Sequence, residues 1–157
     1  MPADPAATAA LVQKIREAAI ERPGPASEQP ALAKAISGKT WRFDANDLRI
    51  ASLTLRLDGA DPSFEAEVAG TPAAPAGRFG GPIGFDGQLR VGGRMRYGPS
   101  AARGAWSADG KSLVLEVQTL GNDDATRLTF AFADKTVEVT CELAFGFKTT
   151  LKGRTDE

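Results

Sequence analysis

Residues 103–152 have the sequence RGAWSADGKSLVLEVQTLGNDDATRLTFAFADKTVEVTCELAFGFKTTLK, in which apolar and polar side chains alternate along five short segments. Within each segment every second residue is apolar, and these residues would share one face of the sheet: Trp106, Leu113, Leu115, Val117, Leu128, Phe130, Phe132, Val137, Val139, Cys141, Phe147 and Leu151. The opposite face would carry the polar residues Arg103, Glu116, Gln118, Arg127, Thr129, Glu138, Thr140, Glu142, Lys148 and Lys152. A period of two residues is typical of half-buried antiparallel strands, so we expect five consecutive strands here.

Three turns predict how these strands pair. Asp109-Gly110 is typical of a two-residue type I′ hairpin, Asp134-Lys135 marks a second hairpin, and the loop 144–146 ends in Gly146. The inward pairs expected from these turns are Trp106–Leu113, Gly104–Leu115, Phe132–Val137, Phe130–Val139, Leu128–Cys141, Leu143–Phe147 and Val139–Leu151. The outward pairs are Arg103–Glu116, Arg127–Glu142, Thr129–Thr140, Glu142–Lys148 and Glu138–Lys152. Because a slip of one residue would invert both faces, the three turns together predict the register.

Shorter alternating segments precede this stretch. We expect strands over the ranges 39–44, 51–57 and 64–68. Antiparallel pairing of the last two would set Leu57 opposite Phe64 and Arg56 opposite Glu65.

A fourth upstream strand is expected over residues 85–91, with Phe85, Leu89 and Val91 facing inward. The Gly-, Pro- and Ala-rich residues 70–83 are interpreted as a long loop, and residues 92–102 fit either a strand or a loop. The total is eight or nine short strands joined by turns, which indicates an all-β sandwich or an antiparallel up-and-down barrel. Sequential hairpins favour the barrel, of the lipocalin-like type, because closure leaves no exposed strand edge.

The first 38 residues are rich in alanine and differ from the rest. A helix is expected over residues 4–22, with Asp4 as its N-cap and Pro5 at the first helical position. A second short helix is expected over residues 30–37, ending at Gly38. One or two short helices therefore precede the barrel, and we divide the chain into a helical connector, 1–38, and a β-barrel domain, 39–154.

The composition argues against several classes of partner. The 157 residues include 19 basic and 20 acidic side chains, a net charge of −1, which gives no electrostatic case for binding nucleic acid. No apolar run approaches the length of a membrane span, so no membrane partner is expected. The N-terminus lacks the basic start and apolar core of a secretory signal, which leaves the compartment open, with the cytoplasm as the default expectation.

The residues needed for common catalytic chemistry are missing. The chain has no histidine and one cysteine, which excludes Ser-His and Cys-His nucleophile pairs and most zinc sites. Cys141 falls on the inward parity and is interpreted as a small buried apolar residue. No cofactor and no metal are expected.

Four residues are candidates for lining a ligand site or the barrel mouth: Trp41, Arg96, Tyr97 and Trp106. The inward parity of the two tryptophans also fits an ordinary place in the core.

Several segments resemble a domain appended to β-lactamase-related serine hydrolases. They are Pro30–Leu32, Ile36–Phe43, Leu53–Leu55, Pro82–Gly87 and Ala102–Trp106. In that family the hydrolase domain comes first, and the appended domain is a small antiparallel barrel similar to lipocalins. The catalytic Ser-x-x-Lys, Tyr-x-Asn or Ser-x-Asn, and Lys-Thr-Gly elements belong to the hydrolase domain. None occurs here: no serine has lysine three residues on, Tyr97 is followed by Gly-Pro, and neither Lys-Thr pair is followed by glycine.

The resemblance implies a non-catalytic accessory module with a serine hydrolase domain as partner, in the same or a separate chain. A second possibility is a lipocalin-like barrel that binds a small apolar ligand. The third, an enzyme in its own right, has no supporting constellation of residues.

Overall fold

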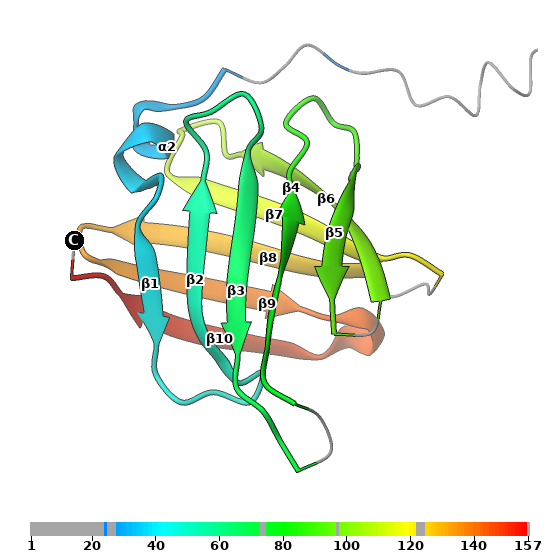
Figure 1. The fold of residues 1–157 in the computed structure, drawn as a ribbon. Coiled ribbons are helices and arrows are strands. Elements are labelled where there is room, and N and C mark those ends of the chain that lie inside the picture. The colour runs from blue at the N-terminus through cyan, green and yellow to red at the C-terminus, as the bar shows by residue number, and fades with distance from the viewer. Residues whose placement is uncertain (1–23, 25–27, 73–74, 97, 122–124, 157) are drawn as a thin grey trace, which may run out of the picture.

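The computed structural model describes residues 24, 28–72, 75–96, 98–121 and 125–156. They form a ten-stranded closed antiparallel barrel in which each strand pairs with its neighbour in sequence and β10 closes against β1 (Figure 1). The elements are α2 (Ala31–Ile36), β1 (Thr40–Phe43), β2 (Ile50–Arg56), β3 (Ser63–Val68), β4 (Gly77–Pro82), β5 (Arg90–Met95), β6 (Gly98–Trp106), β7 (Ser112–Thr119), β8 (Ala125–Ala133), β9 (Thr136–Glu142), the 3-10 turn η1 (Ala144–Gly146) and β10 (Lys148–Arg154). Strands β1 to β5 form the front wall in Figure 1, and β7 to β10 run across behind them.

The expected all-β antiparallel barrel is confirmed, but the strand count is ten rather than eight or nine. The register predicted for the last five strands is also confirmed. Trp106 lies opposite Leu113, Phe130 opposite Val139, and Glu142 opposite Lys148. The outward pair Arg103–Glu116 forms an ion pair of 3.0 Å.

The pairing predicted between β2 and β3 was wrong. Leu55, not Leu57, lies opposite Phe64, and Arg56 lies opposite Ser63. Strand β2 ends at Arg56, one residue earlier than expected, and the next backbone N–H, that of Leu57, donates to Ser37 Oγ at 2.8 Å.

The interpretation of residues 70–83 as a loop was wrong, since β4 occupies Gly77–Pro82 and pairs with β3 along its whole length. Glycine does not mark a turn here; it lets two strands come unusually close. A Cβ on Gly81 would lie 2.3 Å from Gly93 Cα on β5. Glycines of this kind mark a sharp bend at a barrel corner.

The strand expected over residues 85–91 was misplaced. Phe85 is buried but lies before β5, which begins at Arg90, and the undecided residues 92–102 belong largely to β5 and β6. Val91 is 67% exposed because the register shifts between Val91 and Gly93. Phe147 was also predicted to face inward and is 49% exposed, at the end of the 3-10 turn.

Helix α2 confirms the expectation for residues 30–37, and Gly38 follows it with φ of 80°. Ala33 and Ile36 are buried against the barrel, so α2 closes one end, which we call the helix end. The helix expected at residues 4–22 lies outside the described residues. No helix in the described part of the chain is long and apolar enough to cross a membrane.

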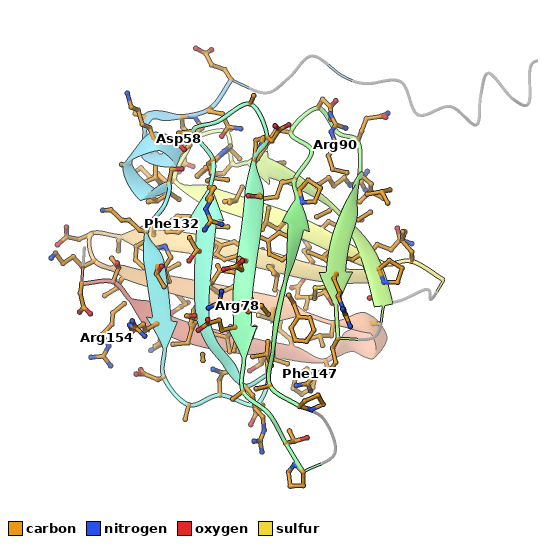
Figure 2. All side chains as sticks on the ribbon, in the orientation of Figure 1. Asp58, Arg78, Arg90, Phe132, Phe147 and Arg154 are labelled. Atoms are coloured by element: carbon orange, nitrogen blue, oxygen red, sulfur yellow. The ribbon has the colours of Figure 1, made fainter. Side chains whose placement is uncertain are left out.

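The chain direction reverses at every turn, so the connections alternate between two ends of the barrel. The connections β2–β3, β4–β5, β6–β7 and β8–β9 lie at the helix end. The connections β1–β2, β3–β4, β5–β6, β7–β8 and β9–β10 lie at the other, which we call the loop end. Figure 2 places Phe132 near the helix end and Phe147 toward the loop end.

Candidate functional site

The structure places the two candidate tryptophans at one end of the barrel and Arg96 at the other. Trp41 is fully buried at the helix end, with its ring 5.6 Å from that of Phe132. Trp106 lies on the other side of Phe132, with ring centroids 6.5 Å apart. Arg96 lies in the β5–β6 turn at the loop end, and Tyr97 lies outside the described residues. The two tryptophans and Arg96 therefore do not form one site.

The tryptophans are placed as core residues. Trp41 belongs to the main hydrophobic cluster, and its indole Nε1 is buried without a hydrogen-bond partner. Trp106 is half-buried, and its Nε1 donates to Gln29 Oε1 at 2.7 Å. The partner is 77 residues away in sequence, so no local pattern could have predicted this bond.

The connector is attached to the helix end at several points. The backbone N–H of Gly24 donates to the Asp86 carbonyl at 2.8 Å, and Gln29 accepts the bond from Trp106. Ser37 Oγ donates to the Asp58 carboxylate, a bond that is the main reason why the pKa of Asp58 lies below its usual value. These bonds attach Gly24, Gln29 and Ser37 to the helix end of the barrel.

A recess of about 290 Å³ lies beside this path. Its lining consists of Gln29, Leu57, Gly59, Ala60, Asp61, Pro62, Pro82, Ile83, Phe85, Asp86 and Arg90. Arg90 pairs with Asp86 at 2.6 Å, and the hydrogen bond from Arg90 is the chief cause that lowers the pKa of Asp86. We call this the helix-end recess; it combines apolar walls with one ion pair.

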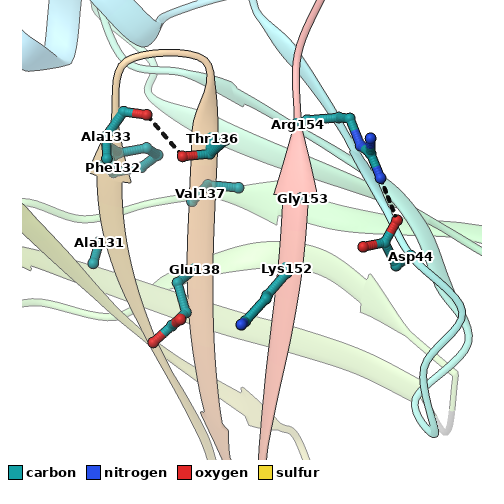
Figure 3. Close-up of a pocket in the computed structure, with 10 residues that line it drawn as sticks. All are labelled: Asp44, Ala131, Phe132, Ala133, Thr136, Val137, Glu138, Lys152, Gly153 and Arg154. Atoms are coloured by element: carbon teal, nitrogen blue, oxygen red, sulfur yellow. Dashed lines mark hydrogen bonds and ion pairs between the residues drawn. The ribbon is translucent and has the colours of Figure 1, made fainter.

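A larger groove of about 590 Å³ lies along β8, β9 and β10 (Figure 3). Glu138 and Lys152 face each other across its floor, and Arg154 pairs with Asp44 at 2.8 Å at its edge. The dashed lines in Figure 3 mark that ion pair and the 2.8 Å bond from Thr136 Oγ1 to the Ala133 carbonyl. Arg154 and Asp44 therefore pair with each other at the edge of this groove.

The inner wall changes character toward the loop end. Inward positions there are Met95, Leu128 and Leu143, which are half-buried, together with Ser100, Thr119, Thr126 and Thr149. Several inward positions nearer the helix end are apolar and almost fully buried, such as Leu55 at 0% and Leu57 at 2% exposure, while Trp106 and Phe132 are partly buried there. Sequence reasoning missed this ring of hydroxyls, although the inward parity of the threonines was visible.

Within the described residues, no group of three or more histidine, cysteine, aspartate or glutamate side chains is placed to hold a metal ion. No protein-family model matches the chain, and no curated protein matches its sequence.

Cys141 is fully buried on β9, and burial raises the pKa of its thiol to about 11 from an ordinary value of 9.0. The folded chain therefore holds this proton more tightly than the unfolded chain. The thiol's contribution to the free energy of unfolding is fully present below pH 9 and is lost as the pH rises toward 11. The loss is about 1.4 kcal/mol for each unit by which the pKa differs between the folded and the unfolded chain.

We expect Cys141→Ala to flatten the fall in unfolding free energy between pH 9 and pH 11, measured by urea unfolding at a series of pH values. Both proteins carry every other titrating group, so the difference between their slopes reports the thiol alone. Identical slopes would show that the thiol is not buried as described.

Proposed function

We propose that this chain is a non-catalytic accessory barrel, of the lipocalin-like type, that packs beside a serine hydrolase domain in the same or a separate chain. The observation that carries the proposal is the attachment of the connector. Gln29 and Gly24 are bonded to Trp106 and Asp86, so the described part of the connector lies beside the helix-end recess. A domain joined ahead of the connector would therefore be tethered to the barrel on this side.

The filled core supports the same proposal. Trp41, Phe130, Leu113 and Leu115 are 0% exposed, so the middle of the barrel is occupied by its own side chains. In barrels of this size, side chains commonly fill the interior. Such a barrel would act through its outer surface and its ends.

The helix-end recess is the surface that we assign to the hydrolase. Its apolar walls and its single ion pair match the mixed character of interfaces between domains. Reversing the charge at Arg90 would leave Asp86 beside a second negative group. The matched charge reversal at the loop end is Lys148→Glu, where lysine pairs with Glu142 at 2.8 Å.

The test uses a Ser-x-x-Lys hydrolase encoded beside this chain or in frame with it, supplied as a separate domain. We expect a 1:1 complex with a Kd of about 1 μM or tighter by isothermal titration calorimetry. Arg90→Glu should weaken the complex at least tenfold, and Lys148→Glu should leave it unchanged. No complex, or equal weakening by both variants, would refute the assignment.

The isolated chain should hydrolyse p-nitrophenyl acetate no faster than buffer does. Saturable hydrolysis with a burst of nitrophenol would make the chain an enzyme and overturn the non-catalytic proposal.

A second function, binding of a small apolar ligand, is favoured by one observation. Met95, Leu128 and Leu143 face inward at the loop end and are only partly buried, unlike Leu55 and Leu115, which are fully buried.

A further inference from the structure

The ten junctions between neighbouring strands of the barrel are not equally paired. Strands β6 to β10 share seven registered pairs at each of their four junctions. By contrast, β4 and β5 share one registered pair, and β1 and β10, where the barrel closes, share two. The next smallest number is three, between β1 and β2. Backbone pairing therefore holds the barrel together least at β4–β5 and at β1–β10.

These two junctions divide the barrel into two halves, each made of one continuous stretch of chain. The first half contains β1 to β4 and the second contains β5 to β10, and the chain passes between them through residues 83–89 (Figure 1). The halves share the apolar core and bonds such as that from the Gly104 N–H to the Gly84 carbonyl at 2.8 Å. Because each half is a single stretch, these contacts can be rebuilt between the halves of two different chains.

The connection between the halves depends on a tight reversal at Gly87. Its φ is 82°, in the left-handed region, and the Asp86 carboxylate beside it accepts a hydrogen bond from the Gln88 N–H at 3.2 Å. The reversal also brings the Gln88 carbonyl against Gly84, where no room is left for a Cβ. An extended connection would need neither feature, and it would carry the first half of one chain to the second half of another.

We propose that the chain pairs with a second copy of itself by exchanging its first half. Strands β1 to β4 of each chain complete the barrel of the partner copy, so both barrels keep the strand pairing and the core of the monomer. The junctions β4–β5 and β1–β10 become the interface between the copies, and residues 86–88 are the hinge. This inference goes beyond the proposed hydrolase partner and does not depend on it.

Strain at the hinge is expected to favour the dimer. Valine tolerates a positive φ poorly, so Gly87→Val destabilises the reversed connection of the monomer and not an extended one. The variant and the wild type are refolded from urea at a series of protein concentrations, and their dimer fractions are measured by size exclusion with light scattering. We expect the monomer–dimer Kd of Gly87→Val to be at least about tenfold lower than that of the wild type.

Gly146→Val is the matched control for strain. Gly146 has φ of 78°, and among the described residues no atom lies within 4 Å of a Cβ added there or at Gly87. Gly146 lies in the β9–β10 connection, within the second half, so its turn is needed in the monomer and in the dimer alike. Gly146→Val should therefore leave the monomer–dimer Kd unchanged.

A disulfide across the β1–β10 junction distinguishes exchange from contact between closed barrels. Arg42 and Arg154 are exposed and lie opposite each other there, at a separation suited to a disulfide. In Arg42→Cys/Arg154→Cys, oxidation links the monomer within one chain. It links the exchanged dimer between two chains, which then stay together in a denaturing gel without reductant. The control pair Arg103→Cys/Glu116→Cys joins β6 to β7 within the second half and stays within one chain in both states.

The dimer should carry interchain links at the junction pair and intrachain links at the control pair. A dimer whose junction link stays within each chain would mean contact between closed barrels and would overturn the proposal. Equal dimer fractions in Gly87→Val and Gly146→Val would overturn the assignment of the hinge. If Gly87→Val does not fold, the junction pair in the otherwise wild-type chain decides the question: interchain links after refolding at high concentration support exchange, and their absence refutes it.

Discussion

Replacing Phe130 with alanine is expected to lower the free energy of unfolding by about 3–5 kcal/mol. Phe130 is 0% exposed on β8, between Leu113 on β7 and Val139 on β9. Its ring stacks on that of Phe132, with centroids 6.0 Å apart and an angle of 8° between the planes. Alanine would leave a cavity that the closed barrel walls cannot collapse to fill, so the cavity cost adds to the lost burial.

The measurement is urea unfolding followed by circular dichroism, with Phe147→Ala as the matched control. The same side chain is removed there from a position 49% exposed, so its loss should cost less than about 1 kcal/mol. Similar losses in the two variants would show that Phe130 does not lie in a packed interior.

Gly81→Ala is expected to destabilise the chain by about 3 kcal/mol or more, although it adds a single methyl group. That methyl carbon would lie 2.3 Å from Gly93 Cα and 2.9 Å from Gly93 N, and both are backbone atoms that cannot rotate away. Strand β4 would have to move away from β5 to make room for this methyl group. The two strands share one registered pair, Gly80 with Arg94, so few backbone bonds would resist this movement and the barrel would open there.

Gly59→Ala is the control for this substitution. Gly59 lies in the β2–β3 connection, where the nearest atom to an added Cβ is Asp61 N at 4.0 Å. The free energy of unfolding should change by less than about 1 kcal/mol. Alanine lowers the conformational entropy of the unfolded chain, which favours the folded state. If Gly81→Ala were equally mild, the close approach of β4 and β5 would be wrong.

Side-chain alternation predicted the second half of the barrel because every strand from β7 to β10 presents one apolar and one polar face. It failed at β4, where Gly77, Gly80 and Gly81 have no side chains to alternate. Strand β4 forms where its backbone comes close to that of β5. This close approach depends on residues about a dozen positions further along the sequence.

The alternation of apolar and polar side chains also does not predict where a strand bends or which end of the barrel is closed. The register shift after Val91 turns its side chain outward, and the 3-10 turn does the same to Phe147. Helix α2 was predicted as a segment, but its position over one end follows from the burial of Ala33 and Ile36 in the core. Without that placement, Arg96 could not be assigned to the opposite end.

The central claim is that the ten strands close into one barrel, with β1 paired to β10. The most direct test is a nuclear Overhauser experiment on the backbone protons of Phe43 and Gly153, which lie opposite each other at this junction. We predict cross-strand signals between these two residues, together with signals between Arg42 and Arg154. Complete absence of both, alongside the expected signals between Phe130 and Val139, would mean an open sheet and would contradict the account.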